Sequence, residues 1–561
     1  MRARRWARGA ALAVLAAIAV LVPSASAEDQ AGKVSPELIE HVSQSVGLHY
    51  YLAHPDAAPS RFAADDLTRP AGRRVQSCTA NANKDVFNCD IFGLPQNEES
   101  SASCPTNDDL VLGGTNDYRG LIDPEGNFTG WHWSTDGGHS VRNEGLLPPI
   151  TLVKVPPSHD VPSGGDPVDF IPAGCDSVYA ASLAYNPANP FGDANGIAVY
   201  KSTPAILSSC QAFTDAGATN PACWPVRRPV AEADQSHFLD KEWMFVGVQN
   251  GVRYVWVTYS DFAIDQNSPL GFTGAQVKAV RCDANLVTCS QPILISGGDA
   301  DVQFSDVTVG PDGRTYITWS QIVGELEQTD QTFIHKIRVE TAPGSMVFGP
   351  THVIYEETNA IPFGGFLHSN DFRIATYMKS DVTNVRGHPR VFAIWEACAV
   401  RLLGFVCHEP QIKLSYSDDS GATWTGPIIL SDGGDNYFPT ISVDRTYTTD
   451  NVAAAWFTNR YDIGFHNQQD VVATSINPLT GQSRGLKRLT NSSNEAEADP
   501  LLGGLFIGDY IEGVLIKNRY YVQSNANYRK VPLLGGLVND PDQPVIPLNQ
   551  QDNYIYVTGL N

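Results

Sequence analysis

The sequence predicts an all-β protein, a β-propeller built from four-stranded antiparallel blades. One kind of segment recurs seven times: a turn residue, then alternating β-branched and aromatic residues, then a polar end. Neighbouring copies lie about 60 to 75 residues apart, which exceeds a minimal blade of about 40 to 50 residues and leaves room for loop insertions. No useful helical pattern follows the N-terminal apolar run, apart from residues 35–49.

A short apolar run stands just before each of the seven copies, and one or two further apolar runs follow most of the middle copies. The copies cover residues 109–119, 176–186, 251–262, 312–321, 388–397, 450–460 and 517–526. Four short strands per unit, repeated radially, is the pattern of a propeller. Seven copies favour seven blades, but the first and last copies are irregular, so six blades plus closing strands is an alternative. Two stacked β-sandwiches are the competing architecture, but their strands would not need to repeat at this regular spacing.

The N-terminus has the pattern of a secretory signal peptide. Four arginines precede an apolar run over residues 10–22, and the small residues Ala25-Ser26-Ala27 follow. The run is short for a membrane-spanning helix, although a retained anchor is the alternative. We expect a signal peptide over 1–27, an N-terminal extension over 28–92, a propeller over 93–561, and a secreted protein with no membrane anchor.

Charge limits the partners. Without the four arginines of the leader, the chain keeps 34 basic and 61 acidic residues. An acidic surface repels nucleic acid phosphates and anionic lipids, so we expect no nucleic acid partner.

The cysteines indicate disulfides. There are ten, an even number, and no Cys-x-x-Cys pair occurs. In an oxidising compartment such cysteines tighten local loops. Several are close neighbours, namely Cys78 and Cys89, Cys210 and Cys223, Cys282 and Cys289, and Cys398 and Cys407. The pairing itself cannot be deduced from the sequence.

Two short motifs have the same spacing. Residues 417–424 read SDDSGATW, and residues 134–141 read STDGGHSV, with Val in place of the aromatic residue. Such a motif makes a hairpin in which Ser and Asp side chains bond backbone amides and Gly takes a positive φ. The pattern resembles the Asp-box, or BNR repeat, of sialidases and related secreted propellers. Further similar phrases are GLPQNE at 93–98, NDYR at 116–119, DKEW at 240–243 and GDY at 508–510.

This resemblance covers roughly residues 93–557 and implies where a site would lie. In the family the Asp-box is a structural turn after the third strand of a blade, on the face opposite the active site. The ends of second strands and the starts of first strands share that opposite face. Side chains expected there are Asp117, Tyr118, Arg119, Asp261, Glu396, Asn459, Arg460, Tyr528 and Arg529 at strand-two ends, and Lys241, Glu242, Asp371, Arg373, Tyr437, Asp509 and Tyr510 at strand-one starts.

The resemblance also implies roles. A sialidase binds its substrate carboxylate with three arginines and uses a Tyr nucleophile, a supporting Glu and an Asp acid. Carried over, these roles fall on Arg119, Arg373 and Arg460 for substrate binding, and on Asp117, Glu396, and Tyr510 or Tyr528 for catalysis.

This chain departs from the family pattern. The first-arginine motif, Phe-Arg-Ile-Pro, is absent from the N-terminal blade; the nearest match, at residues 370–374, comes late and lacks the Pro. Glu396 follows Arg373 instead of preceding the second arginine. For each arginine the alternative is a blade-to-blade ion pair. For Glu396 the alternative is a structural role, and for the two tyrosines it is closure of the central funnel.

Other site classes find little support. Serine-hydrolase elbows, zinc-protease motifs and phosphate loops do not occur. The acidic loops 299–301 and 432–436 lack calcium-loop spacing, so we expect no cofactor, with calcium left open.

We therefore predict a monomer that binds a glycan or glycoconjugate. The leading interpretation is an exo-acting glycoside hydrolase of the retaining sialidase type, acting on anionic terminal sugars. The alternative is a non-catalytic glycan- or protein-binding propeller, and a third is a purely structural surface protein.

Overall fold

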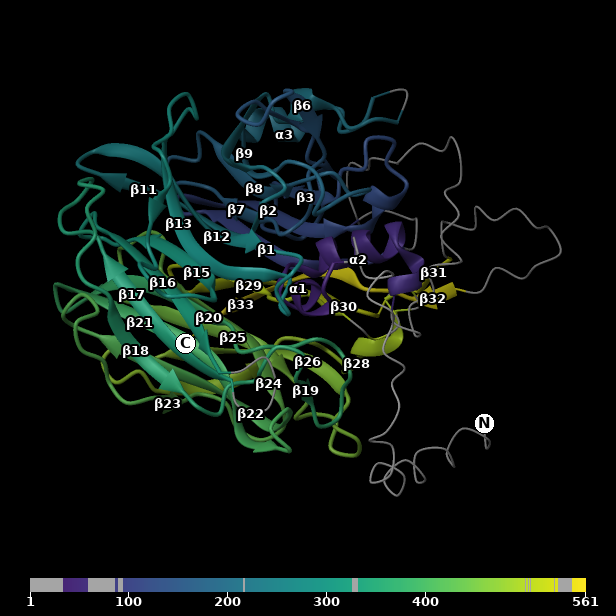
Figure 1. Cartoon of the computed structure of the whole chain (residues 1–561). Coiled ribbons are helices and arrows are strands. Elements are labelled where there is room, and N and C mark those ends of the chain that lie inside the picture. The colour runs from purple at the N-terminus through teal and green to yellow at the C-terminus, as the bar shows by residue number, and fades with distance from the viewer. Residues whose placement is uncertain are drawn as a thin grey trace, which may run out of the picture.

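The computed structural model describes residues 34–58, 86–88, 94–214, 217–324, 331–499, 501–502, 504, 506–528, 530–532 and 547–560. The expected signal peptide (1–27), Cys78, Cys89 and Arg529 lie outside these residues. The predicted fold class is confirmed: seven antiparallel sheets form a seven-bladed β-propeller. The yellow strands of the last blade lie between the blue first blade and the green sixth blade (Figure 1).

The first four blades each have four strands in sequence order from the axis outwards. Their strands are β1 (Gln96–Cys104), β2 (Asn107–Asp117), β3 (Thr129–Ser134) and β4 (Asn143–Leu146); β7 (Val168–Phe170), β8 (Val178–Ala184), β9 (Asn195–Ser202) and β10 (Val226–Ala233); β11 (His237–Gln249), β12 (Val252–Ile264), β13 (Phe272–Asp283) and β14 (Ile293–Leu294); β15 (Val302–Val309), β16 (Thr315–Val323), β17 (Thr332–Val339) and β18 (His352–Glu357).

The other three blades complete the circle. Their strands are β20 (Met378–Val385), β21 (His388–Leu402), β22 (Val406–Ser417) and β23 (Ile428–Ile429), with β19 (Phe366–Leu367) added; β24 (Asn436–Val443), β25 (Val452–Thr458), β26 (Gln468–Ile476) and β27 (Ser483–Arg488), with β28 (Asn494–Glu495) added; β29 (Glu512–Ile516), β30 (Arg519–Ala526) and β33 (Asp552–Gly559). Outside the blades lie the hairpin strands β5 (Ile150–Leu152) and β6 (His159–Val161), β31 (Lys530–Pro532) and β32 (Pro547–Asn549), and the helices α1 (Pro36–His41), α2 (Gln44–Ala53) and α3 (Pro204–Ser209).

The seven repeated segments of the sequence are the second strands of the seven blades: β2, β8, β12, β16, β21, β25 and β30. The first strands, β1, β7, β11, β15, β20, β24 and β29, contact one another in that order, and β29 contacts β1. The first strands therefore surround the central axis as a closed ring.

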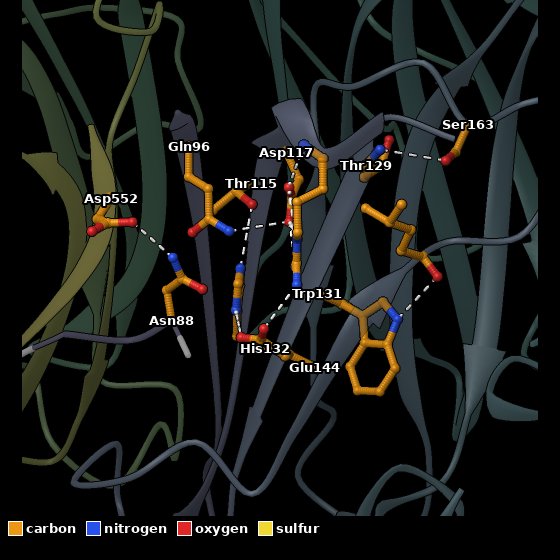
Figure 2. Close-up of polar contacts among 12 residues, drawn as sticks. Asn88, Gln96, Thr115, Asp117, Thr129, Trp131, His132, Glu144, Ser163 and Asp552 are labelled. Atoms are coloured by element: carbon orange, nitrogen blue, oxygen red, sulfur yellow. Dashed lines mark hydrogen bonds and ion pairs between the residues drawn. The ribbon is translucent and has the colours of Figure 1, made fainter. Parts of the chain in front are cut away.

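A segment from near the N-terminus completes the seventh blade. Val86 forms a β-bridge with Tyr554, and the Phe87 amide donates to the Asn553 carbonyl at 2.8 Å. The Asn88 amide donates to Asp552 at 2.7 Å (Figure 2). Residues 86–88 thus lie along the edge of β33 that β30 leaves free, and this contact closes the ring.

Apolar side chains of the second strands fill the space between blades. Trp256, Trp319, Trp395 and Trp456 lie on four of these strands and are fully buried. Burying a large apolar side chain contributes about 1.5–3 kcal/mol, so alternation along these strands drives the blades together.

Eight cysteines of the described residues form four disulfides. Three of these join the close neighbours noted in the sequence, and the fourth joins Cys104 of the first blade to Cys175 of the second. The described residues contain no helix that is long and apolar enough to cross a membrane.

The two similar motifs follow β3 and β22, the third strands of blades one and five. In the second, the Thr423 amide and hydroxyl donate to Asp419 at 2.8 and 2.6 Å. The Ser417 hydroxyl accepts from the amide of Gly421, whose φ is +85°. The first motif repeats every one of these bonds with its Ser, Asp, Gly and Ser.

Candidate active site

The first strands share a backbone irregularity near their starts. In β1, β11, β15 and β24 the pairing register shifts over four residues, and the second of these has a positive φ. These left-handed residues are Glu98, Lys241, Phe304 and Phe438, with φ between 50° and 56°. Such bulges re-aim side chains and cluster next to active sites, and a left-handed non-Gly residue costs about 1–3 kcal/mol. The same irregularity in four blades marks this end of the ring as the candidate site.

A small cavity lies at this level and is lined by polar and aromatic side chains from several first strands. Its volume is about 40 Å³, enough for water but far below the roughly 300–1,000 Å³ of ligand pockets. At the other end of the ring a second cavity of about 410 Å³ is lined by residues such as Phe245, Arg445 and Glu512. We call the side chains around the small cavity the funnel cluster: Glu98, Asp166, Asp240, Lys241, Glu242, Trp243, Arg373, Tyr377, Lys379, Asp509 and Tyr510.

Asp509 is the ionised centre of the funnel cluster. Its Oδ2 accepts from Arg373 Nη2 at 2.7 Å and from Lys241 Nζ at 3.1 Å. Burial acts to raise the pKa of Asp509, but the charges of Arg373 and Lys241 outweigh burial and hold this pKa below its ordinary value.

Glu98 lies beside Asp509 and has the opposite character. Its Oε1 accepts from the Asp509 amide at 3.1 Å, and its Oε2 accepts from Asn116 Nδ2 at 2.5 Å. Burial, followed by the charges of Asp166 and Asp509, raises the pKa of Glu98 well above its usual range. The surroundings of Glu98 therefore favour its protonated form, and those of Asp509 favour its ionised form.

Glu242 is a second acid of this kind. It is 3% exposed and lines the small cavity, and among the described residues neither of its carboxyl oxygens has a hydrogen-bond partner. Burial, then the neighbouring Asp166, raises the pKa of Glu242 well above its usual range. A carboxyl that is buried without a partner, as in Glu242, is costly unless it is protonated. Burial is also the largest cause that raises the pKa of Asp240 to about 7.

Aromatic rings form one wall of the cavity. Trp243 and Tyr510 meet edge to face with ring centroids 5.7 Å apart, and the Tyr510 hydroxyl donates to the Pro167 carbonyl at 3.0 Å. Lys379 Nζ lies over the Trp243 ring, 2.9 Å from its centroid. Burial lowers the pKa of Lys379 to about 8.

Arg119 and Asp117, both predicted site residues, belong to a network inside the first blade. Arg119 is fully buried; its Nε donates to Asp117 at 2.9 Å, and its Nη1 donates to Glu144 at 2.8 Å. Glu144 also bonds His132 at 3.1 Å, and Asp117 accepts from Gln96 at 3.1 Å (Figure 2). These ion pairs lie within one blade, whereas the alternative considered for this arginine was a pair between blades.

The remaining predicted residues lie in separate surroundings. Arg460 is partly exposed and pairs with Asp432. Glu396 lies within β21, where burial raises its pKa well above the usual range. Tyr528 donates to the Ser492 carbonyl.

Of the predicted site residues, the structure brings Arg373 and Tyr510 together in the funnel cluster, with Lys241, Glu242 and Asp509 from the longer list. The catalytic and substrate-binding roles assigned from the resemblance remain predictions.

Sequence reasoning missed Glu98 and Asp166 as funnel residues. For Asp166 the available signal was an acid after a Gly shortly before a first strand, as also at Gly508-Asp509; Glu98 lies within β1 and had no such signal. Because bulges break the alternation of these strands, periodicity alone does not show which way such side chains point.

Within the described ranges, no group of three or more His, Cys, Asp or Glu residues is arranged to hold a metal ion. The expectation of no cofactor, with calcium left open at the acidic loops, stays untested.

No protein-family model and no curated protein matches this chain. Among solved structures, a protein of unknown function from Dyadobacter fermentans is similar at 10% identity and a TM-score of 0.43, over 86% of this chain and 99% of that one. The GH93 α-L-arabinofuranosidase of Fusarium graminearum is similar at 10% identity and 0.38, over 86% and 98%. A Hadza microbial sialidase is similar at 10% identity and 0.37, over 81% and 91%. Similarities at this level assign no activity to this chain.

Proposed function

We propose that this protein is a glycoside hydrolase whose active site is the funnel cluster. The observation that carries the proposal is a pair of carboxyl groups in one cavity with different partners: among the described residues Glu242 has none, and Asp509 is bonded by Arg373 and Lys241. These surroundings act to raise the pKa of Glu242 and to lower that of Asp509. Glycosidases need one protonated carboxyl and one ionised carboxylate beside the scissile bond.

The roles follow from these surroundings. Glu242 donates its proton to the glycosidic oxygen as the bond breaks, which leaves Glu242 ionised. Asp509, held ionised by Arg373 and Lys241, acts as the nucleophile or as the base that activates water. Trp243 and Tyr510 line the cavity and would pack against the sugar ring.

The hydrogen-bonding groups of the funnel cluster fit a neutral, hydroxyl-rich sugar. Its five carboxyl groups can accept hydrogen bonds from sugar hydroxyls. Arg373 is already paired with Asp509, which leaves its guanidinium less available to a substrate carboxylate.

The sialidase-type interpretation is the second candidate, supported by the buried guanidinium of Arg373 within the cluster. It requires Arg119 and Arg460 to reach the same ligand. A retaining mechanism would be shown by the anomeric configuration of the first product in an NMR time course.

The test is a panel of fluorogenic glycosides that includes neutral pyranosides, arabinofuranosides and a sialoside. Glu242→Gln should lower kcat at least about 10²-fold, because the general acid is lost. Glu396→Gln is the matched control, since Glu396 is equally buried and also has a raised pKa. Loss of activity in the Glu396 variant alone would instead support the assignment from the sequence resemblance.

No turnover of any glycoside, together with binding on a glycan array, would favour the non-catalytic alternative. If neither is seen, the structural-protein alternative gains support.

We also propose that the protein is exported, because four disulfides among the described residues fit an oxidising compartment.

A further inference from the structure

The turn between α1 and α2 lies against the funnel cluster. The Ser43 amide donates to Asp240 Oδ2 at 2.7 Å, and the Ser43 hydroxyl donates to Asp166 Oδ1. Arg373 Nη1 donates to the Val42 carbonyl at 2.8 Å. A backbone amide, a hydroxyl and a carbonyl of this turn therefore engage two carboxyls and one guanidinium of the candidate active site.

These are the contacts that a hydroxyl-rich ligand would make. Sugar hydroxyls would donate to Asp166 and Asp240, and a ring or hydroxyl oxygen would accept from Arg373. The turn already uses the hydrogen-bonding atoms of Asp166, Asp240 and Arg373. A sugar bonded to these three groups and the docked turn therefore exclude each other, and Asp166 also lines the small cavity of about 40 Å³.

The two helices depend on the propeller for their stability. They have 6 and 10 residues, and isolated helices of fewer than about 12 residues are marginal in water. Leu38, Val42 and Val46 are at most 1% exposed, and His41 stacks on Phe363 at 4.5 Å. Contact with the ring therefore holds the two short helices in place, and undocking would expose the apolar side chains of this face to water.

We propose that residues 34–53 form an intramolecular plug, which competes with the ligand for Asp166, Asp240 and Arg373. The site is closed while α1 and α2 are docked, and it opens when they leave. The nature of the ligand rests on the proposed function, whereas the closure rests on the contacts of the turn.

The test weakens the plug without altering the funnel cluster. Ser43 has φ −53° and ψ 140°, and Val42 before it is extended, so the backbone angles at position 43 suit proline. The proline ring would stand where the Ser43 amide now bonds Asp240, which weakens docking of the turn. Ser43→Pro removes both the amide bond to Asp240 and the hydroxyl bond to Asp166. Ser43→Ala removes only the hydroxyl bond, and Ser209→Ala on the exposed end of α3 is the control.

Access to the cavity is measured by labelling. Ser305 lines the cavity and its hydroxyl has no partner among the described residues, so Ser305→Cys places a thiol there. A small maleimide is the probe, and the parent protein without this cysteine is the blank. The full-length Ser305→Cys chain is compared with and without Ser43→Pro, and amide hydrogen exchange of residues 36–53 is followed in parallel.

Ser43→Pro should raise the labelling rate and the exchange of residues 36–53 about tenfold or more, because hydrogen bonds to charged groups are lost. Ser43→Ala should have a smaller effect, and Ser209→Ala none. An unchanged labelling rate would overturn the proposal. Faster hydrogen exchange spread evenly over the blades would also overturn it, because the helices would then be a structural part of the ring. Faster labelling without glycoside turnover would support the plug and count against the hydrolase.

Discussion

Replacing Arg119 by methionine tests whether this arginine serves stability or substrate binding. Methionine keeps most of the side-chain volume and removes the charge. Asp117 and Glu144, both fully buried, then lose their shared cation. Breaking a buried ion pair from one side typically costs about 3–5 kcal/mol. Asp117 keeps its bond from Gln96, and Glu144 keeps His132, so we expect the loss in the free energy of unfolding to fall in that range.

The matched control is Arg519→Met. Arg519 pairs with Asp108, but their side chains are 50% and 37% exposed, and exposed pairs contribute about 0–1 kcal/mol. Urea unfolding followed by tryptophan fluorescence measures both variants. A loss below about 1 kcal/mol for Arg119→Met, combined with a higher KM, would refute the structural interpretation and restore the substrate-binding role.

Two further predictions concern stability. Burial raises the pKa of Asp306 from 3.8 to about 6, so this group contributes stability below pH 4 that is lost as the pH rises through about 6. The free energy of unfolding of Asp306→Asn, relative to that of the wild type, should therefore increase by roughly 3 kcal/mol between pH 4 and pH 7.5. Urea midpoints measure this difference, and parallel pH profiles of the two proteins would contradict the prediction. Replacing Cys104 and Cys175 by serine opens a covalent loop of 71 residues between two blades and should cost about 2–4 kcal/mol, whereas an unchanged midpoint would mean that blade packing alone sets the stability.

The second strands could be predicted from the sequence because each is buried between two blades and repeats the same alternation. Trp319 in β16 and Trp456 in β25 stand among β-branched and small residues, which identifies both as strand residues. The two Ser/Asp/Gly turns could also be predicted from the sequence, because hydrogen bonds between neighbouring residues specify them.

The first strands were much harder to predict. β1 reads QNEESSASC, a polar stretch typical of a loop, yet every one of its residues is buried. The ring of first strands supplies partners from other blades, such as Glu512 bonding to Ser100, and no local pattern encodes such partners. For the same reason the lowered pKa of Asp509 could not be foreseen, since it depends on Arg373 and Lys241, which lie 136 and 268 positions away along the chain.

The helical pattern at residues 35–49 could be seen in the sequence, but neither its division into α1 and α2 nor the place of these helices against the ring could be predicted. Nothing in its sequence indicates that Ser43 contacts Asp240, which lies 197 residues further along the chain.

The way the ring closes has a consequence for folding kinetics. The Asn88–Asp552 bond joins positions 464 residues apart, whereas Gln96 and Asp117 within a blade are 21 apart. By the logarithmic dependence on loop length, forming the first contact from an open chain costs about 3 kcal/mol more entropy than forming the second. Once the intervening blades have folded, the two edges lie close together and most of this cost disappears. We therefore expect closure to be a late step of folding, and we expect fluctuations that open the ring between the last blade and residues 86–88 to precede global unfolding.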